Sequence, residues 1–333
     1  MKTVLIITDN LPDQINGVVT TYKNIETIAR NDGYHFVYID PREFRHVGLF
    51  VYPEVKLAWV RKIGKKIRKI QPNHIHIATE GPIGLAAKVW CDRKKFSYTT
   101  SYHTRFPEAI KKLLGIPEFI TWSYIRWFHK KSSTVFTTTE TMVGELKEHK
   151  FHSEVIPWSS GVDREIFNTD AATEDLTGCY PVLLCVSRIS KEKNLEDFCS
   201  LEYPGATKIL VGDGPHRKEL EKNYPDVVFT GFKTGKELAK YYANADVFVF
   251  PSRWETFGIV MIEAMACGTP VAAYPEDGPL DVIEEGKTGY TDKDLRTAIH
   301  RCLGINRNKV LKHSAKWSWE NCWNIFKERL VKV

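Results

Sequence analysis

The sequence has 333 residues, a length that suits two domains, and its 43% apolar and 26% charged residues are typical of a soluble globular protein. Its seven cysteines stand singly and form no C-x-x-C pair, which argues against zinc and favours reduced thiols in a cytosolic compartment. No apolar run is long enough for a membrane-spanning helix, and the apolar stretch near Met1 is too short for a signal-peptide core.

The net charge of +6 is unevenly distributed along the chain. Residues 1–165 contain 25 Lys and Arg against 17 Asp and Glu, an excess of eight positive charges. The remaining residues contain 22 against 24, an excess of two negative charges. A basic first half indicates an anionic partner for that half, without identifying it.

The first half alternates apolar strands with helices. We predict strands at residues 4–8, 35–39, 74–79, 96–104 and 134–139. The first strand runs through a loop rich in Gly, Pro and Asn into a helix from Val18 to about Arg30. A strand, a glycine turn and a helix N-terminus can bind phosphate, which makes Gly17 a candidate ligand, although a plain turn explains the same residue.

Three of the histidines in these strands are candidates for a metal or ligand site. His74 and His76 share one face of a strand, but no third metal ligand is evident, so we interpret both as structural. His103 stands at the polar carboxyl end of the strand at residues 96–104. Ligands bind at that end of the strands in open α/β sheets, so His103 is the better functional candidate.

Two basic segments of the first half each permit two interpretations. Residues 60–70 predict a helix with one apolar face and six Lys or Arg on the other, either exposed to water or in contact with anionic lipid headgroups. Residues 106–131 mix aromatic residues with Lys and Arg, which is typical of an interfacial segment or of a core helix with a wide apolar stripe. On one helical face of this segment we place Phe119, Trp122, Ile125 and Phe128.

The second half repeats the α/β pattern, with strands predicted at residues 182–186, 209–211, 227–233, 247–250 and 270–274. The loop after the first of these strands contains Arg188 and Lys193. Two fixed cations after a strand can clamp a diphosphate, since Arg binds it bidentately and Lys acts as a point charge. A solvated loop is the alternative.

Residues 251–270 predict a loop followed by a helix that begins near Ile259. Because Gly258 has no side chain, the free amides of Ile259 and Val260 can approach an anion closely. Glu255 lies in the loop, and Glu263 lies on the helix with its side chain leaning back toward the same opening. Two carboxylates beside an anion site suit a ligand with hydroxyls and phosphates, such as a sugar nucleotide.

The run E-x-F-G-I-V-x-x-E-A-M-A-C-G-T-P-V at residues 255–271 resembles the signature of retaining family-4 glycosyltransferases, which have the GT-B fold. The resemblance covers nearly the whole chain and is strongest between Pro181 and Pro279. It implies two Rossmann-like, doubly wound α/β domains facing across a cleft. The expected boundaries are an acceptor-binding domain at residues 1–165, a sugar-nucleotide-binding domain at 166–312, and a C-terminal helix at 313–333 that returns to the first domain.

The resemblance also implies residue roles. It assigns the transferred sugar to Glu255, the ribose to Glu263, and the leaving diphosphate to the R-x-x-x-x-K pair Arg188 and Lys193. His103 would border the transferred sugar, which makes it a fourth catalytic candidate beside Arg188, Lys193 and Glu255. The remaining donor-binding candidates are Asn16, Gly17, Phe232, Phe257, Gly258, Ile259 and Val260.

The expected reaction is sugar transfer with retention, without a metal or another cofactor. The aromatic and basic first half, and a resemblance to bacterial enzymes that make membrane glycolipids, favour a lipid acceptor such as diacylglycerol. A UDP-sugar is the favoured hexose donor, although the sequence does not settle the donor. We therefore expect a cytoplasmic protein, peripheral on the inner face of the cell membrane through its basic first domain, with no nucleic-acid partner.

Other functions stay open at this stage. The same resemblance includes GDP-mannose-dependent alpha-mannosyltransferases that act on a lipid or polysaccharide. A GT-B sugar-nucleotide epimerase and a silent sugar-nucleotide-binding module share the fold. A nicotinamide dehydrogenase is disfavoured, because the first loop lacks the dinucleotide fingerprint.

Overall fold

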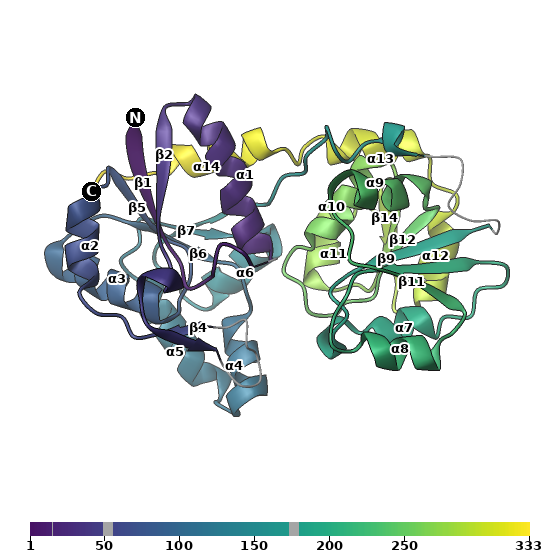
Figure 1. The fold of residues 1–333 in the computed structure, drawn as a ribbon, viewed down its shortest axis with the longest axis horizontal. Coiled ribbons are helices and arrows are strands. Elements are labelled where there is room, and N and C mark those ends of the chain that lie inside the picture. Colours follow the sequence, from purple (N-terminus) through teal and green to yellow (C-terminus); the bar gives the residue numbers. More distant parts are fainter. Residues whose placement is uncertain (15, 49–55, 173–179) are drawn as a thin grey trace. The chain divides into compact units, whose positions relative to one another are not determined.

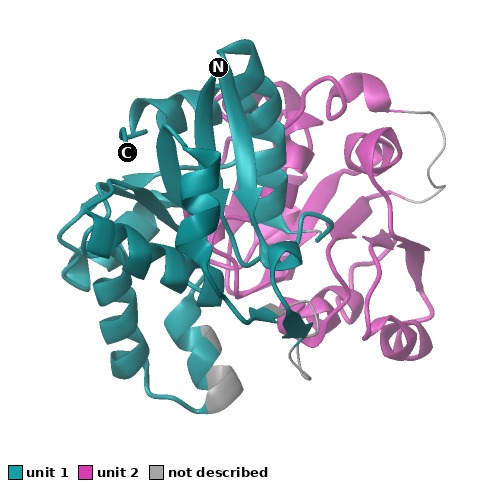
Figure 2. Cartoon of the chain, turned by 60° about the vertical axis from the view of Figure 1, so that its left-hand side comes forward, with its two compact units in different colours: residues 1–160, 319–333 teal, residues 161–318 magenta. Residues whose placement is uncertain are grey.

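The computed structural model describes residues 1–14, 16–48, 56–172 and 180–333. These residues form two compact units, which are described separately: unit 1 is residues 1–160 with 319–333, and unit 2 is residues 161–318 (Figure 2). The chain passes between the units after Ser160 and again after Ser318, where we expected the boundaries after residues 165 and 312.

Unit 1 is built on a six-stranded parallel sheet in the order β2-β1-β5-β6-β7-β8 (Figure 1). Its strands are β1 Lys2–Ile7, β2 Tyr34–Ile39, β5 His74–Ile77, β6 Thr99–Tyr102, β7 Thr134–Thr137 and β8 Glu154–Pro157. Its helices before the crossing are α1 Gly17–Asn31, α2 Ile63–Ile70, α3 Pro82–Lys94, α4 Phe106–Leu114, α5 Glu118–His129 and α6 Glu140–Glu148. Alternate residues of β1 pack into different clusters, Val4 with α1 and Leu5 with α2 and α3, so helices cover both faces of the sheet.

The C-terminal helix α14, Trp319–Glu328, completes the core of unit 1. Its Phe326 is fully buried, with its ring 5.1 Å from Trp158 between centroids. The indole of Trp323 donates to Asp32 at the end of α1 (2.8 Å), and the indole of Trp158 donates to the Cys322 carbonyl (2.9 Å). The prediction that the last helix returns to the first domain is confirmed.

Unit 2 repeats the architecture with a six-stranded parallel sheet in the order β11-β10-β9-β12-β13-β14 (Figure 1). Its strands are β9 Val182–Val186, β10 Thr207–Val211, β11 Val227–Gly231, β12 Val247–Phe250, β13 Val271–Ala273 and β14 Gly289–Thr291. Its helices are α7 Leu195–Cys199, α8 Arg217–Asn223, α9 Gly235–Asn244, α10 Ile259–Ala266, α11 Asp277–Val282, α12 Leu295–Cys302 and α13 Arg307–Ser314. The predicted fold class, two doubly wound α/β domains, is confirmed.

The structure corrects some local predictions. Gly115, with φ +69°, separates α4 from α5, so residues 106–131 are two helices. Phe119 is 70% exposed, whereas Trp122 and Phe128 on the predicted shared face are buried. Among the elements that the sequence patterns missed are the edge strands β8 and β14, the helices α12 and α13, the antiparallel strands β3 His46–Gly48 and β4 Lys56–Ala58, and the turn η1 Pro41–Glu43.

The cysteines and the longer helices are described here for the ranges given above. Six of the seven cysteines lie there, and all six are buried and free; Cys179 lies outside those ranges. Within the same ranges, no helix combines the length and the apolar character needed to cross a bilayer.

Candidate functional site

Three main candidates in unit 2 lie on the loops that follow two neighbouring strands, β9 and β12. In the sheet, β9 pairs with β12 and β12 pairs with β13, all parallel, so their carboxyl ends meet at one edge. The loop after β9 contains Arg188 and Lys193, and the loop after β12 contains Glu255. Parallel pairing thus brings together residues that are more than sixty positions apart in the chain.

Each candidate cation of unit 2 faces a carboxylate. Lys193, at the end of the 3-10 turn η3 Lys191–Lys193, pairs with Glu255, and Arg188 pairs with Glu192. Burial raises the pKa of Glu192. The hydrogen bond that Ser190 donates and the nearby positive charge of Arg188 outweigh burial, so the pKa of Glu192 lies below its usual value. A diphosphate would therefore compete with Glu192 and Glu255 for the two cations.

Two glycines shape the backbone around Glu255. Gly258 precedes α10 with φ +82°, and a Cβ there would lie 2.8 Å from Met261 Cε. A Cβ on Gly278, in α11, would lie 2.9 Å from the Glu255 carbonyl oxygen. Gly258 was predicted, whereas Gly278 was missed because only the packing of α11 against the loop reveals its role.

Glu263 lies on α10, where it accepts a hydrogen bond from the Tyr242 hydroxyl of α9 at 2.9 Å. Burial raises the pKa of Glu263 to about 7, although the Tyr242 hydrogen bond lowers it. The carboxyl therefore takes up and releases its proton near neutral pH. Sequence patterns gave no sign of Tyr242, which reaches Glu263 only through the packing of two helices.

The two phenylalanine candidates differ in exposure. Phe232 follows Gly231 at the end of β11 and is 54% exposed, so its ring is available to a ligand. Phe257 is 6% exposed and packs edge-on to Trp317 at 6.5 Å between centroids. Any donor contact of Phe257 would therefore come from its main chain.

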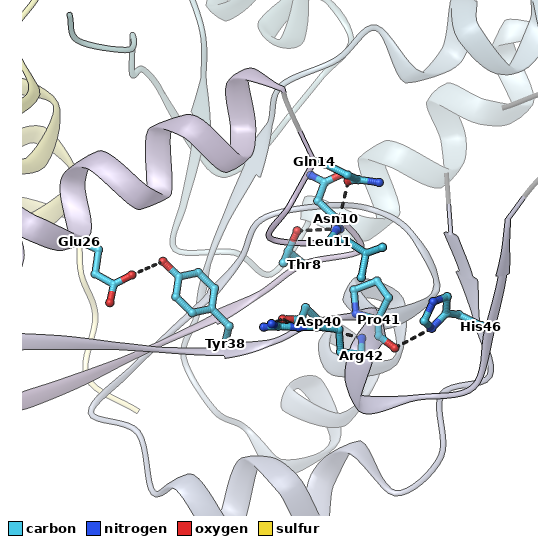
Figure 3. A network of polar contacts seen from close by, with 10 residues as sticks. All are labelled: Thr8, Asn10, Leu11, Gln14, Glu26, Tyr38, Asp40, Pro41, Arg42 and His46. Carbon is cyan, nitrogen blue, oxygen red and sulfur yellow. Dashed lines mark hydrogen bonds and ion pairs between the residues drawn. The ribbon is translucent and has the colours of Figure 1, made fainter. Parts of the chain in front are cut away.

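The unit 1 candidates follow β1 and β6, the second and fourth strands in the order of its sheet. Asn16 caps α1 by accepting from the Val19 amide at 2.9 Å, and Gly17 is the first residue of that helix. Hydrogen bonds within the preceding loop stabilise it. The main-chain amide of Asn10 donates to the Thr8 hydroxyl, and the main-chain amide of Leu11 donates to the side-chain oxygen of Gln14 (Figure 3).

His103 directly follows β6 in unit 1. Its ring lies 5.7 Å from Trp158 and 6.4 Å from Tyr22 between centroids. Burial lowers the pKa of His103 to about 4, so the imidazole is neutral at physiological pH. A neutral ring can exchange hydrogen bonds with a sugar hydroxyl but supplies no positive charge for a diphosphate.

One D-x-D triplet, a motif that can bind a metal, occurs at Asp292–Asp294 in unit 2. Both carboxylates serve the start of α12: Asp294 accepts from the Arg296 and Thr297 amides, and Asp292 accepts from the Asp294 amide. Across the described parts of the chain, no three His, Cys, Asp or Glu side chains cluster as a metal site would require.

Comparison with known families identifies the chain. A model described as Glycosyltransferase Family 4 matches residues 18–166, and one described as Glycosyl transferases group 1 matches residues 168–294. The chain belongs to the family-4 glycosyltransferases. The family suggested by the signature at residues 255–271 is confirmed, as is the prediction of a transferase.

The relatives of this glycosyltransferase have names that specify different sugars. Sulfoquinovosyl transferase SQD2 of Arabidopsis thaliana is 32% identical over 71% of the chain. This alignment covers only 50% of the length of that relative. The GDP-mannose-dependent alpha-mannosyltransferase of Mycobacterium tuberculosis is 29% identical over 86% of the chain and 82% of its own length. The alpha-monoglucosyldiacylglycerol synthase of Acholeplasma laidlawii is 27% identical over 88% of the chain and 85% of its own length.

The fold of the glycosyltransferase has solved counterparts. A sucrose-phosphate synthase of Thermosynechococcus elongatus matches it with a TM-score of 0.78 and 19% identity, over 98% of both chains. At this identity the likeness concerns the fold alone, and it confirms the GT-B class.

Replacing Glu255 tests its predicted contact with the sugar. Glu255→Gln keeps the side-chain shape but removes the charge that faces Lys193, so we expect kcat for sugar transfer to fall by about 10²–10³-fold. The control is Glu285→Gln, which alters an exposed glutamate of the same unit. Steady-state kinetics on folded protein measures the effect, and full activity of Glu255→Gln would refute the role.

The raised pKa of Glu263 predicts two pH effects. The folded pKa of about 7 exceeds the ordinary value of 4.5, so this residue stabilises the fold below the ordinary value and loses that effect as pH rises through 7. Ionised Glu263 is the better acceptor for ribose hydroxyls, so nucleotide affinity should strengthen between about pH 6 and about pH 8. Calorimetric titration of Glu263→Gln should show a flatter profile; an unchanged rise would contradict the assignment.

Proposed function

We propose that this glycosyltransferase moves a hexose from a nucleoside diphosphate sugar, with a UDP-hexose as the favoured donor, to a membrane lipid such as diacylglycerol. The observation that carries the proposal is the meeting of Lys193 and Glu255 at the carboxyl edge of the unit 2 sheet, beside the start of α10. A cation and a carboxylate held side by side match a ligand that presents phosphate next to sugar hydroxyls.

The charges of unit 2 fit the departure of a diphosphate. When the bond between the anomeric carbon and the phosphate oxygen breaks, negative charge develops on the leaving group. Arg188 and Lys193 supply fixed positive charges for it. The free main-chain amides of Ile259 and Val260, at the positive end of the α10 dipole, supply hydrogen-bond donors. The lipid hydroxyl bonds to the anomeric carbon on the face that the diphosphate leaves and gives its proton to the departing phosphate oxygen, which results in retention without an enzymic nucleophile.

The outer face of α5 supports a lipid acceptor. Phe119, Ile120 and Trp127 are 70%, 49% and 44% exposed, which is unusual for large apolar side chains so close together on one helix. Basic residues follow at the carboxyl end of α5, where a hollow of about 270 Å³ is lined by Arg126, Trp127, His129, Lys130, Lys150, Phe151, His152 and Ser153. Exposed aromatic residues beside positive charge suit the interface of an anionic membrane.

The named relatives support the choice of acceptor. The name of the Acholeplasma laidlawii relative specifies glucosyl transfer to diacylglycerol, and the alignment covers most of both chains. GDP-mannose is the second candidate donor, because the Mycobacterium tuberculosis relative is equally well covered.

The direct test of function is transfer itself. UDP- and GDP-sugars are first screened by thermal shift, and the stabilising donors are then supplied, with the sugar labelled, to diacylglycerol in mixed micelles containing EDTA. We expect label in the lipid phase, with the anomeric configuration of the donor, and about 10²–10³-fold slower labelling with Glu255→Gln. Failure of every donor to bind or transfer would contradict the proposal, and conversion of the donor without acceptor would indicate an epimerase.

Membrane contact through α5 is tested separately. Phe119→Ala/Ile120→Ala/Trp127→Ala should weaken co-sedimentation with phosphatidylglycerol vesicles by about tenfold or more, since each side chain buries apolar surface worth roughly 1.5–3 kcal/mol when fully inserted. The matched comparison is Lys65→Ala/Lys69→Ala on the exposed face of α2. Wild-type binding by the α5 variant, or loss in the α2 variant alone, would overturn the assignment to α5.

A further inference from the structure

A hydrogen-bonded hub in unit 2 joins the three loops at the carboxyl edge of its sheet. The carboxylate of Asp197, on α7, accepts from the Asn194 amide at 2.5 Å and from the Tyr274 hydroxyl at 2.6 Å. Tyr274 follows β13, and burial raises its pKa to about 12, which keeps its hydroxyl protonated as a donor. Asp197 thereby connects the loop after β9 to the residue that ends β13.

Arg253 brings the loop after β12 into the same hub. Its guanidinium lies 3.9 Å from the Asp197 carboxylate and stacks over the Tyr274 ring at 3.6 Å. It also faces Glu276 at 3.5 Å, on the segment after β13. Arg253 is two residues before Glu255, so the hub holds the backbone from which Glu255 projects.

Asn194 links the hub to Lys193, the preceding residue. Its backbone is left-handed, with φ +54° and ψ +37°, a conformation that asparagine tolerates better than most residues. Its side chain makes no capping bond to α7, although the residue precedes that helix. Instead the amide donates both to Asp197 and to the Pro251 carbonyl at 3.3 Å, which begins the loop that leads to Glu255.

We propose that Asn194, held by Asp197, is a positioning residue that sets the Lys193 ammonium opposite Glu255; the inference rests on the donor role proposed for Lys193. The left-handed residue separates η3 from α7. The single amide then ties the backbone beside Lys193 to the start of the Glu255 loop.

The physical reason is the length of the lysine side chain. Lys193 acts as a point charge on a flexible four-carbon stem, so the placement of its ammonium depends on a fixed backbone origin. Displacement of a catalytic group by about 1 Å can cost about 10²-fold in rate. An amide is required at position 194 because it donates to Asp197, whereas a carboxylate there would repel it.

Asn194→Gly isolates the contribution of the side chain. Glycine adopts the left-handed backbone without strain, so the change removes the two hydrogen bonds and keeps the turn. We expect kcat for sugar transfer to fall about tenfold. In a Lys193→Ala background the same change should lower kcat less than about twofold, since a positioning residue acts through its partner. Asn194→Asp, which has the same size but no donor, should lose at least as much activity as Asn194→Gly.

The matched control is Lys95→Gly in unit 1, at an exposed residue that shares the left-handed backbone (φ +58°), and it should keep the wild-type kcat. Wild-type kcat in Asn194→Gly, or a loss that adds fully to that of Lys193→Ala, would overturn the inference. A crystal structure of Asn194→Gly adds a readout that needs no activity, because an unchanged Lys193–Glu255 pair would also overturn it. A wild-type protein that transfers no sugar would instead contradict the proposed function.

Discussion

Parallel strand pairing is the constraint on which the candidate site of unit 2 depends. Because β9, β12 and β13 are neighbours and point the same way, the loops that follow them share one edge of the sheet. Lys193 and Glu255 meet there although 62 positions separate them. The buried strands beneath are apolar, whereas the candidate residues lie in the loops and on helix α10, as is common at the strand ends of α/β folds.

The charged candidate residues at this edge are paired with other side chains of the protein. Lys193 faces Glu255, Arg188 faces Glu192, and the Glu263 carboxyl, whose pKa burial raises to about 7, is bonded to a tyrosine. Such pairing limits the cost of keeping charged groups partly away from water. It also gives each group a partner that a phosphate or a sugar hydroxyl can replace with similar geometry, so binding need not create a buried unpaired charge.

The sequence supported the fold class, most strands and the motif from Glu255 to Val271, because these depend on local pattern and spacing. It did not reveal Gly278, Tyr242 or the Asp197 hub, since each acts across segments that only the folded chain brings together. The helical pattern of α5 was also insufficient. Phe119 shares a face with Trp122 by spacing, yet it is exposed because it lies in the first turn of the helix, next to the break at Gly115.

The return of α14 to unit 1 has a consequence for how the protein is made. The rings of Trp323 and Phe326 fill the face of the unit 1 sheet that α1 also covers. A ribosome synthesises residues 161–318 before these rings exist, so unit 2 can collapse around its own core while unit 1 still exposes apolar surface. A segment translated after unit 2 therefore completes the core of unit 1, and chaperone demand should be greatest while residues 1–160 wait for it.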